Sequence, residues 1–219
     1  MPDNVGSNGG ARVLVGIAGG SAAGKTTLAC ALAAALGPER VLCVEQDWYY
    51  HDLSCLDPVA RQAYNFDRPE ALELNLLCQH LRSLRRGETV LRPDYDFATH
   101  TRLDEWQILT PRELVLLEGT LVLADAALRE LLDIRVYVDA PRATRLARRL
   151  TRDVAERGRD VSSCLDQHWH SVWPMHDVFV EPSRRYADVV VAGDALSAGV
   201  LCGLADRIDK SASRAKSAA

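Results

Sequence analysis

A glycine-rich loop between two apolar segments constrains the fold of this chain more than any other feature. Residues 19–26 read GGSAAGKT and match the pattern G-x-x-x-x-G-K-[ST]. The preceding run RVLVGIA is β-branched and apolar, as in a buried strand, and the following run TTLACALAAAL is typical of a helix that ends at Gly37-Pro38. Backbone N–H groups of such a loop, backed by a helix N-terminus, attract phosphate. The motif therefore predicts that the chain binds a nucleoside triphosphate.

The positions of this loop have distinct expected roles. Lys25 should reach the β- and γ-phosphates, and the Thr26 hydroxyl should ligate Mg²⁺. The alternative, a glycine-rich turn that holds no ligand, is disfavoured because a strand and a helix flank the motif. The residues expected to bind the nucleotide are Gly19, Gly20, Ser21, Ala22, Ala23, Gly24, Lys25, Thr26 and Thr27.

Composition narrows the class of protein. With 219 residues, 47% of them hydrophobic, the chain suits one core, so we expect a single domain over 12–210 with polar tails at 1–11 and 211–219. A net charge of −4 argues against nucleic acid or an anionic membrane as the main partner. We find neither a membrane-length apolar run nor the basic and apolar regions of a signal peptide. The six scattered cysteines do not indicate a disulfide framework, so the expected location is cytoplasmic.

The order of the predicted elements indicates the fold class. Short apolar segments without period-2 alternation are typical of strands buried on both faces, and here they alternate with helices. Residues 87–110 break this rhythm and suggest a β-rich insertion. We predict an α/β P-loop NTPase three-layer fold with a mostly parallel five-stranded sheet, that small β-rich insertion and a helical lid near 145–165. The expected strands are 13–18, 41–45, 114–118, 134–138 and 188–192, and the expected helices are 26–36, 69–86, 125–132, 141–156, 160–179 and 196–209.

Two acidic residues follow strands at the edge where an open parallel sheet binds ligands. Asp47 comes directly after the second strand, in EQDWYY, and can accept a hydroxyl proton or help to hold Mg²⁺. An aspartate is a weak base for an alcohol, but phosphoryl transfer tolerates this because the proton leaves late. Glu118 ends the strand LVLLE and resembles a Walker-B acid. Thr26, Asp47 and Glu118 are the candidate metal ligands, and a solvated strand-end acid is the alternative for either carboxylate.

Seven arginines lie between residues 142 and 159, and four of them share one helical face. Gly158 interrupts the helix and predicts a hinge. A basic, hinged arm suits a lid that closes over phosphates and excludes water, whereas a solvated basic face is the alternative. The arginines are Arg142, Arg145, Arg148, Arg149, Arg152, Arg157 and Arg159.

Beyond the loop, the sequence resembles the uridine–cytidine kinase family. The segments QDWYY, YNFDRPEAL, PDYDFATHTR, LLEGTLVL, RRLTRDVAERGRD and EPSRRYADVVV occur in family order between about Val13 and Ala192. The resemblance implies phosphorylation of the 5′-hydroxyl of uridine or cytidine by ATP or GTP with Mg²⁺. It makes Asp47 the catalytic acid. The other catalytic residues that it implies are Lys25, Arg149, Arg152 and Arg157.

The resemblance also implies an acceptor site. Asp67 matches an acid that holds the ribose hydroxyls, and Tyr95 and His100 match residues of the pyrimidine pocket. A 2′-deoxy substrate would leave the Asp67 carboxylate without one partner, which corresponds to roughly 5- to 150-fold in preference. The full set of implied substrate contacts is Asp47, Tyr50, Asp67, Tyr95, His100, Arg149, Arg159 and Gln167. The chain departs from the family pattern at Arg68, at His168-Trp169 and at Val191-Ala192-Gly193-Asp194.

Two other functions share parts of this pattern. A kinase of another small alcohol, such as ribulose 5-phosphate, would have the same loop and the acid after the second strand. A nucleotide-binding regulatory ATPase would need the loop but none of the acceptor residues. The expected partners are a small-molecule nucleoside and a nucleoside triphosphate, together with further copies of the chain, because tetramers occur in the family that it resembles.

Overall fold

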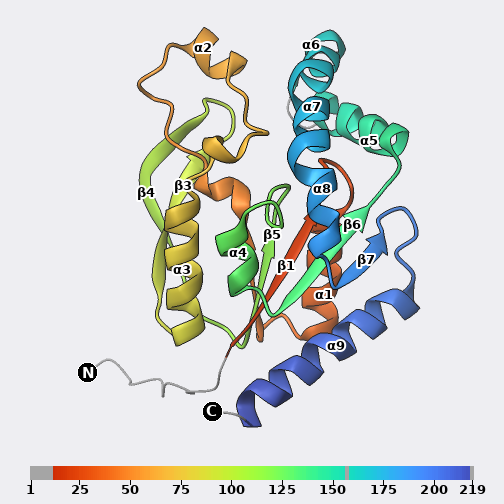
Figure 1. Ribbon diagram of the computed structural model, residues 1–219. Helices are drawn as coiled ribbons and strands as arrows, with labels where there is room; N and C mark the ends of the chain where they lie inside the picture. The colour runs from red at the N-terminus through yellow and green to blue at the C-terminus, as the bar shows by residue number, and fades with distance from the viewer. Residues whose placement is uncertain (1–11, 156–157, 218–219) are drawn as a thin grey trace.

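The computed structural model describes residues 12–155 and 158–217. A five-stranded sheet in the order β2-β5-β1-β6-β7 forms its centre, and every neighbouring pair is parallel. In the register, Glu118 lies opposite both Ile17 and Glu45. The carboxyl ends of three strands therefore meet at one edge (Figure 1). The strands are β1 (Val13–Gly19), β2 (Val41–Glu45), β5 (Leu114–Glu118), β6 (Ile134–Asp139) and β7 (Val189–Ala192).

Helices cover both faces of the sheet, which confirms the predicted three layers (Figure 1). On one face, α1 (Lys25–Leu36) and α9 (Ala198–Ser217) pack against Val15 and Ile17. On the other face, α3 (Leu74–Arg86) and α4 (Ala126–Leu131) pack around Leu14. Because all residues of β1 and β5 are buried on one face or the other, these strands show no polar alternation in the sequence.

Two additions lie outside the central sheet (Figure 1). The first comprises the predicted insertion, an antiparallel hairpin of β3 (Val90–Asp96) and β4 (Thr101–Leu109), and the short helix α2 (Pro58–Ala63). Sequence analysis did not predict α2. Its signal is Asp57, whose carboxylate accepts from the N–H groups of Val59 and Ala60 at 2.9 Å, followed by proline at the first helical position.

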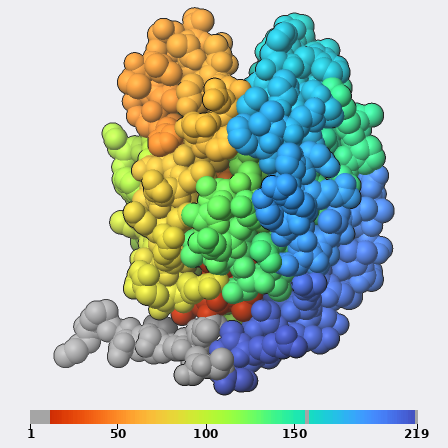
Figure 2. Space-filling view, viewed as in Figure 1, coloured from red at the N-terminus to blue at the C-terminus, as the bar shows by residue number. Residues whose placement is uncertain are grey.

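The second addition is a helical arm that we define as residues 161–186. It follows α5 (Arg142–Ala155), faces the α2 region across a hollow in the surface, and extends beyond the predicted 160–179 (Figure 2). Two of its turns are π-helical, a conformation that often marks functional positions. The arm consists of α6 (Val161–Gln167), a π segment (His168–Val172), α7 (Trp173–Met175), a second π segment (His176–Val180), α8 (Glu181–Ser183) and a 3₁₀ turn (Arg184–Tyr186).

Two sequence predictions need correction. The helix expected over 69–86 is divided, because Leu72 pairs with Tyr50 in a β-bridge between the 3₁₀ turn Pro69–Ala71 and α3. The tail expected from 211 is helical as far as Ser217, because Ala212 is buried and the Lys216 ammonium lies 2.8 Å from Glu113 Oε1. Among the described residues, we find no helix with the length and apolar character needed to span a membrane.

Candidate active site

The glycine-rich loop connects β1 to α1 and is closely packed from outside. Gly19 has a φ of +147°, and a Cβ there would lie 2.3 Å from the Val138 carbonyl oxygen. A Cβ on Gly20 would lie 2.2 Å from Arg145 Nη1. The backbone conformation at Gly19 therefore requires glycine, whereas a side chain at position 20 would force the Arg145 guanidinium to move.

Lys25 occupies the first turn of α1 and is buried, and its Nζ donates to the Gly20 carbonyl oxygen at 3.1 Å. Burial lowers the pKa of Lys25, whereas the carboxylates of Glu118 and Asp47 act in the opposite direction. The ammonium thus lies over the loop beside the two acids that sequence analysis predicted to face it.

Oxygen-bearing side chains lie at the start of α1, after β2 and at the end of β5. Thr26 Oγ1 donates to Glu118 Oε1 at 2.7 Å. Asp47 lies in the 3₁₀ turn Gln46–Tyr49 after β2 and accepts from the Tyr50 hydroxyl. Burial raises the pKa of nearby Glu45, and the negative charges of Glu118 and Asp47 raise it further. Hydroxyl and carboxylate oxygens beside a surplus of negative charge fit Mg²⁺ well.

Arg149 links the loop to the arm. Its guanidinium donates to Ser21 Oγ at 3.0 Å and to Gln167 Oε1 at 2.8 Å. Arg159 donates to the same Gln167 oxygen at 2.7 Å, and Arg152 lies 2.8 Å from a carboxylate oxygen of buried Asp153. The structure therefore brings three predicted lid residues and Gln167 together. Arg157, another of the seven arginines predicted for the lid, lies outside the described residues.

Arg145, one of the arginines predicted for the lid, is instead buried behind the loop, where it pairs with His176. Arg145 Nη2 lies 3.1 Å from His176 Nε2, and the same guanidinium faces Gly20. Burial, and secondly the positive charge of Arg145, depress the pKa of His176 from its ordinary value of 6.5 to about 4. A neutral ring here can accept from the guanidinium and hold it against the loop.

The predicted acceptor residues gather around a cluster of rings. Tyr50 lies 5.6 Å from Tyr95 and 5.2 Å from Phe66, and Phe66 stacks on His100 with ring centroids 4.5 Å apart. Sequence analysis missed Phe66, although it precedes Asp67 in the NFD segment. Burial raises the pKa of Asp67. The positive charges of Arg149 and Lys25 and a hydrogen bond from the Ser171 hydroxyl act in the opposite direction and lower it. The Asp67 carboxylate therefore interacts electrostatically with Arg149 of the lid and with Lys25 of the loop.

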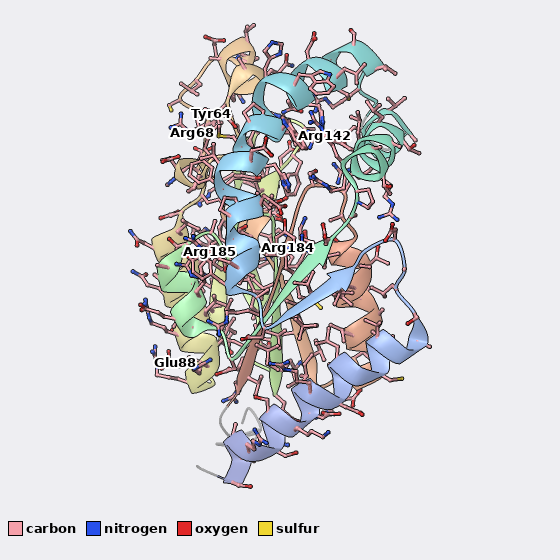
Figure 3. The ribbon with its side chains drawn as sticks, turned by 45° about the vertical axis from the view of Figure 1, so that its right-hand side comes forward. Tyr64, Arg68, Glu88, Arg142, Arg184 and Arg185 are labelled. Atoms are coloured by element: carbon pink, nitrogen blue, oxygen red, sulfur yellow. The ribbon has the colours of Figure 1, made fainter. Side chains whose placement is uncertain are left out.

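The residues that depart from the family pattern lie in three different environments. Arg68 is exposed, pairs with Glu70 at 3.4 Å, and lies on the opposite side of the arm from Arg142 in Figure 3. His168 is buried, and its ring nitrogens have no hydrogen-bond partner within 12–155 and 158–217. Gly193 packs so closely on the loop that a Cβ would lie 2.0 Å from the Ala23 carbonyl oxygen. The segment after β7 therefore borders the donor side of the site.

The fold and the loop, together with the family match that follows, define a phosphotransferase of the P-loop class. The model of the phosphoribulokinase/uridine kinase family matches residues 14–195. The chain belongs to this family, which confirms the resemblance seen in the sequence. A relative named uridine kinase, from Brevibacillus brevis, is 45% identical over 179 residues, which are 82% of this chain and 84% of the relative.

Solved structures agree with this assignment at the level of the fold. A candidate fructose transport system kinase from Silicibacter sp. TM1040 has a TM-score of 0.70 at 23% identity, over 86% of this chain and 92% of the other. Phosphoribulokinase from Rhodobacter spheroides has a TM-score of 0.60 at 15% identity, over 82% and 69%. At these identities, the similarity extends to the fold alone.

Proposed function

We propose that the chain transfers the γ-phosphate of ATP or GTP to the 5′-hydroxyl of uridine or cytidine, giving the nucleoside monophosphate for pyrimidine salvage. One observation carries the proposal: an aromatic cluster and the Asp67 carboxylate lie together on the acceptor side of the phosphate loop. Stacked rings suit a planar base, and a carboxylate suits a vicinal diol. The similarity to a relative named uridine kinase supports the same substrate class.

The proposed roles follow from charge and position. Lys25 and the loop N–H groups bind the phosphates, while Thr26, Asp47 and Glu118 would hold Mg²⁺, which neutralises charge on the transferring group. Asp47, held by the Tyr50 hydroxyl, accepts the proton of the attacking alcohol. Arg149, Arg152, Arg157 and Arg159 contribute positive charge and, with Gln167, help to exclude water when the lid closes.

Each alternative function lacks part of this support. A kinase of ribulose 5-phosphate must bind an anionic acceptor, whereas the acceptor side here presents the rings of Tyr50, Phe66 and Tyr95 beside the carboxylate of Asp67. A regulatory ATPase has no use for such a cluster. The aromatic cluster therefore favours a neutral nucleoside.

The deciding experiment measures ADP release from ATP and Mg²⁺ with uridine, cytidine, 2′-deoxyuridine, ribulose 5-phosphate or no acceptor. We expect turnover with uridine or cytidine and roughly 5- to 150-fold lower kcat/KM with the 2′-deoxynucleoside. Turnover with ribulose 5-phosphate but not with either nucleoside would refute the proposal. Hydrolysis that does not depend on an acceptor would favour a regulatory ATPase instead.

The hairpin supports the expected self-association. Leu91 and Ile108 are directly opposite each other in the β3–β4 register and are 52% and 67% exposed, and Trp106 is 53% exposed. Neighbouring exposed apolar side chains of this kind are typical of protein interfaces. We therefore propose a homo-oligomer that buries this face. We also propose that the protein works in the cytoplasm.

A further inference from the structure

Ser171 bridges the helical arm and the acceptor region. It lies in the π segment His168–Val172, and its Oγ is 2.8 Å from Asp67 Oδ2 and 2.8 Å from Asn65 Oδ1. These contacts join segments about a hundred residues apart in sequence, on the two sides of the surface hollow (Figure 2). Neither residue identity nor spacing in the sequence predicts this contact.

A serine hydroxyl has one hydrogen, so it can donate to only one of these oxygens at a time. Asn65 Oδ1 already accepts from the Asp67 backbone N–H at 3.1 Å. The carboxylate is charged and is therefore the stronger acceptor. We assign the Ser171 hydrogen to Asp67 Oδ2, where it offsets part of the cost of burying that carboxylate.

A carboxylate has about four lone-pair positions, and Ser171 uses one of them. The hydrogen bond fixes the rotation of the carboxyl group and leaves Asp67 Oδ1 and the second lone pair of Oδ2 for other donors. Two adjacent hydroxyl groups of a ribose need two acceptor positions in a fixed orientation. A carboxylate that could rotate freely would have to be ordered when the nucleoside binds, which weakens binding.

The arm carries a second contact just before this one. Gln167, the last residue of α6, accepts hydrogen bonds from Arg149 and Arg159. Arg149 also donates to Ser21 in the phosphate loop. Residues 167 and 171 of the arm therefore connect the lid arginines and the loop with the carboxylate of the acceptor site.

From these contacts, we propose that Ser171 is a positioning residue that orients Asp67 toward the vicinal hydroxyls of the acceptor and so sets the preference for a ribonucleoside. This inference rests on the function proposed above and adds a residue to it. Ser171 acts through Asp67, so we expect it to affect acceptor binding and acceptor choice more than the binding of the nucleotide donor.

The test compares Ser171→Ala with Ser171→Thr, which retains the hydroxyl, and with Ser162→Ala as the matched control. Ser162 lies on the same arm, and its hydroxyl donates to Asp160 Oδ1 at the helix start at 2.6 Å. In Ser171→Ala we expect the KM for uridine to rise roughly tenfold or more, since a hydrogen bond to a charged group is lost. The KM for ATP should stay within about twofold, and the ratio of kcat/KM for uridine to that for 2′-deoxyuridine should fall by a similar factor of roughly ten.

Ser171→Thr should stay close to the wild type in all these quantities, as should Ser162→Ala. If Ser171→Ala does not fold, Ser171→Cys replaces it, because a thiol fills similar space but donates only weakly and should show the same loss of discrimination. An equal loss with uridine and 2′-deoxyuridine, or a Ser171→Thr variant as impaired as Ser171→Ala, would overturn the role of Ser171. A wild-type protein that phosphorylates neither nucleoside would refute the proposed function itself.

Discussion

His176 makes the stability of the fold depend on pH, and the size of the effect can be calculated. The ring is buried beside Arg145, and its Nε2 lies 3.4 Å from Glu181 Oε2. Its pKa falls from 6.5 to about 4 because of burial and the guanidinium charge, with Asp177 and Asp139 opposing this. In the unfolded chain the ring gains a proton as the pH falls through 6.5, whereas in the folded chain it remains neutral until about pH 4. The unfolded state therefore binds more protons in this window, and stability must fall as the pH falls.

The size of the effect follows from the two pKa values. The full difference corresponds to about 3 kcal/mol, of which about 2 kcal/mol is lost between pH 7 and pH 5. Urea unfolding of the wild type and of His176→Gln at both pH values isolates this group, because all other titrating groups are common to the two proteins.

We expect the free energy of unfolding to fall about 2 kcal/mol less in His176→Gln than in the wild type over that range. His170→Gln, which removes an exposed histidine from the same arm, is the matched control for the substitution itself. Parallel pH dependences for the wild type and His176→Gln would refute the reasoning, whatever the difference in absolute stability.

Two further predictions concern the site. Asp47→Asn should bind ATP normally in a binding titration but lose turnover by roughly 10²- to 10⁴-fold, because the amide cannot accept the alcohol proton, and near-normal turnover would remove Asp47 from the mechanism. Gly20→Ala should raise the KM for ATP roughly tenfold or more, because its methyl would lie 2.2 Å from Arg145 Nη1, whereas Gly203→Ala, with nothing within 4 Å, should leave it unchanged.

The elements of the central sheet could be predicted because their signals are local. The apolar run LVLLE identifies β5 as a strand whichever strands it pairs with. The G-x-x-x-x-G-K-[ST] pattern identifies the loop and the start of α1. The errors arose where tertiary contacts override local preference. The Leu72–Tyr50 bridge divides a predicted helix, and burial of Ala212 extends another into a polar segment.

The residues of the candidate site also fall into those that local sequence signals predict and those that depend on tertiary contacts. Asp47 and Glu118 could be placed from their positions after strands, because the ends of neighbouring parallel strands meet at one edge. Phe66, Ser171 and the Arg145–His176 pair could not, because their importance depends on contacts between distant segments. The functional roles of the predicted residues remain predictions that the proposed variants test.

The strand order has a consequence for how the chain reaches its native state. β1 lies between β5 and β6, so the strand that leads into the phosphate loop has no partner until residues 114–118 and 134–139 are present. Such long-range pairing slows folding, since a long loop must close before the contacts form. During synthesis, the apolar strand Val13–Gly19 stays unpaired until more than half of the chain has been made. In this interval the strand can aggregate or bind chaperones.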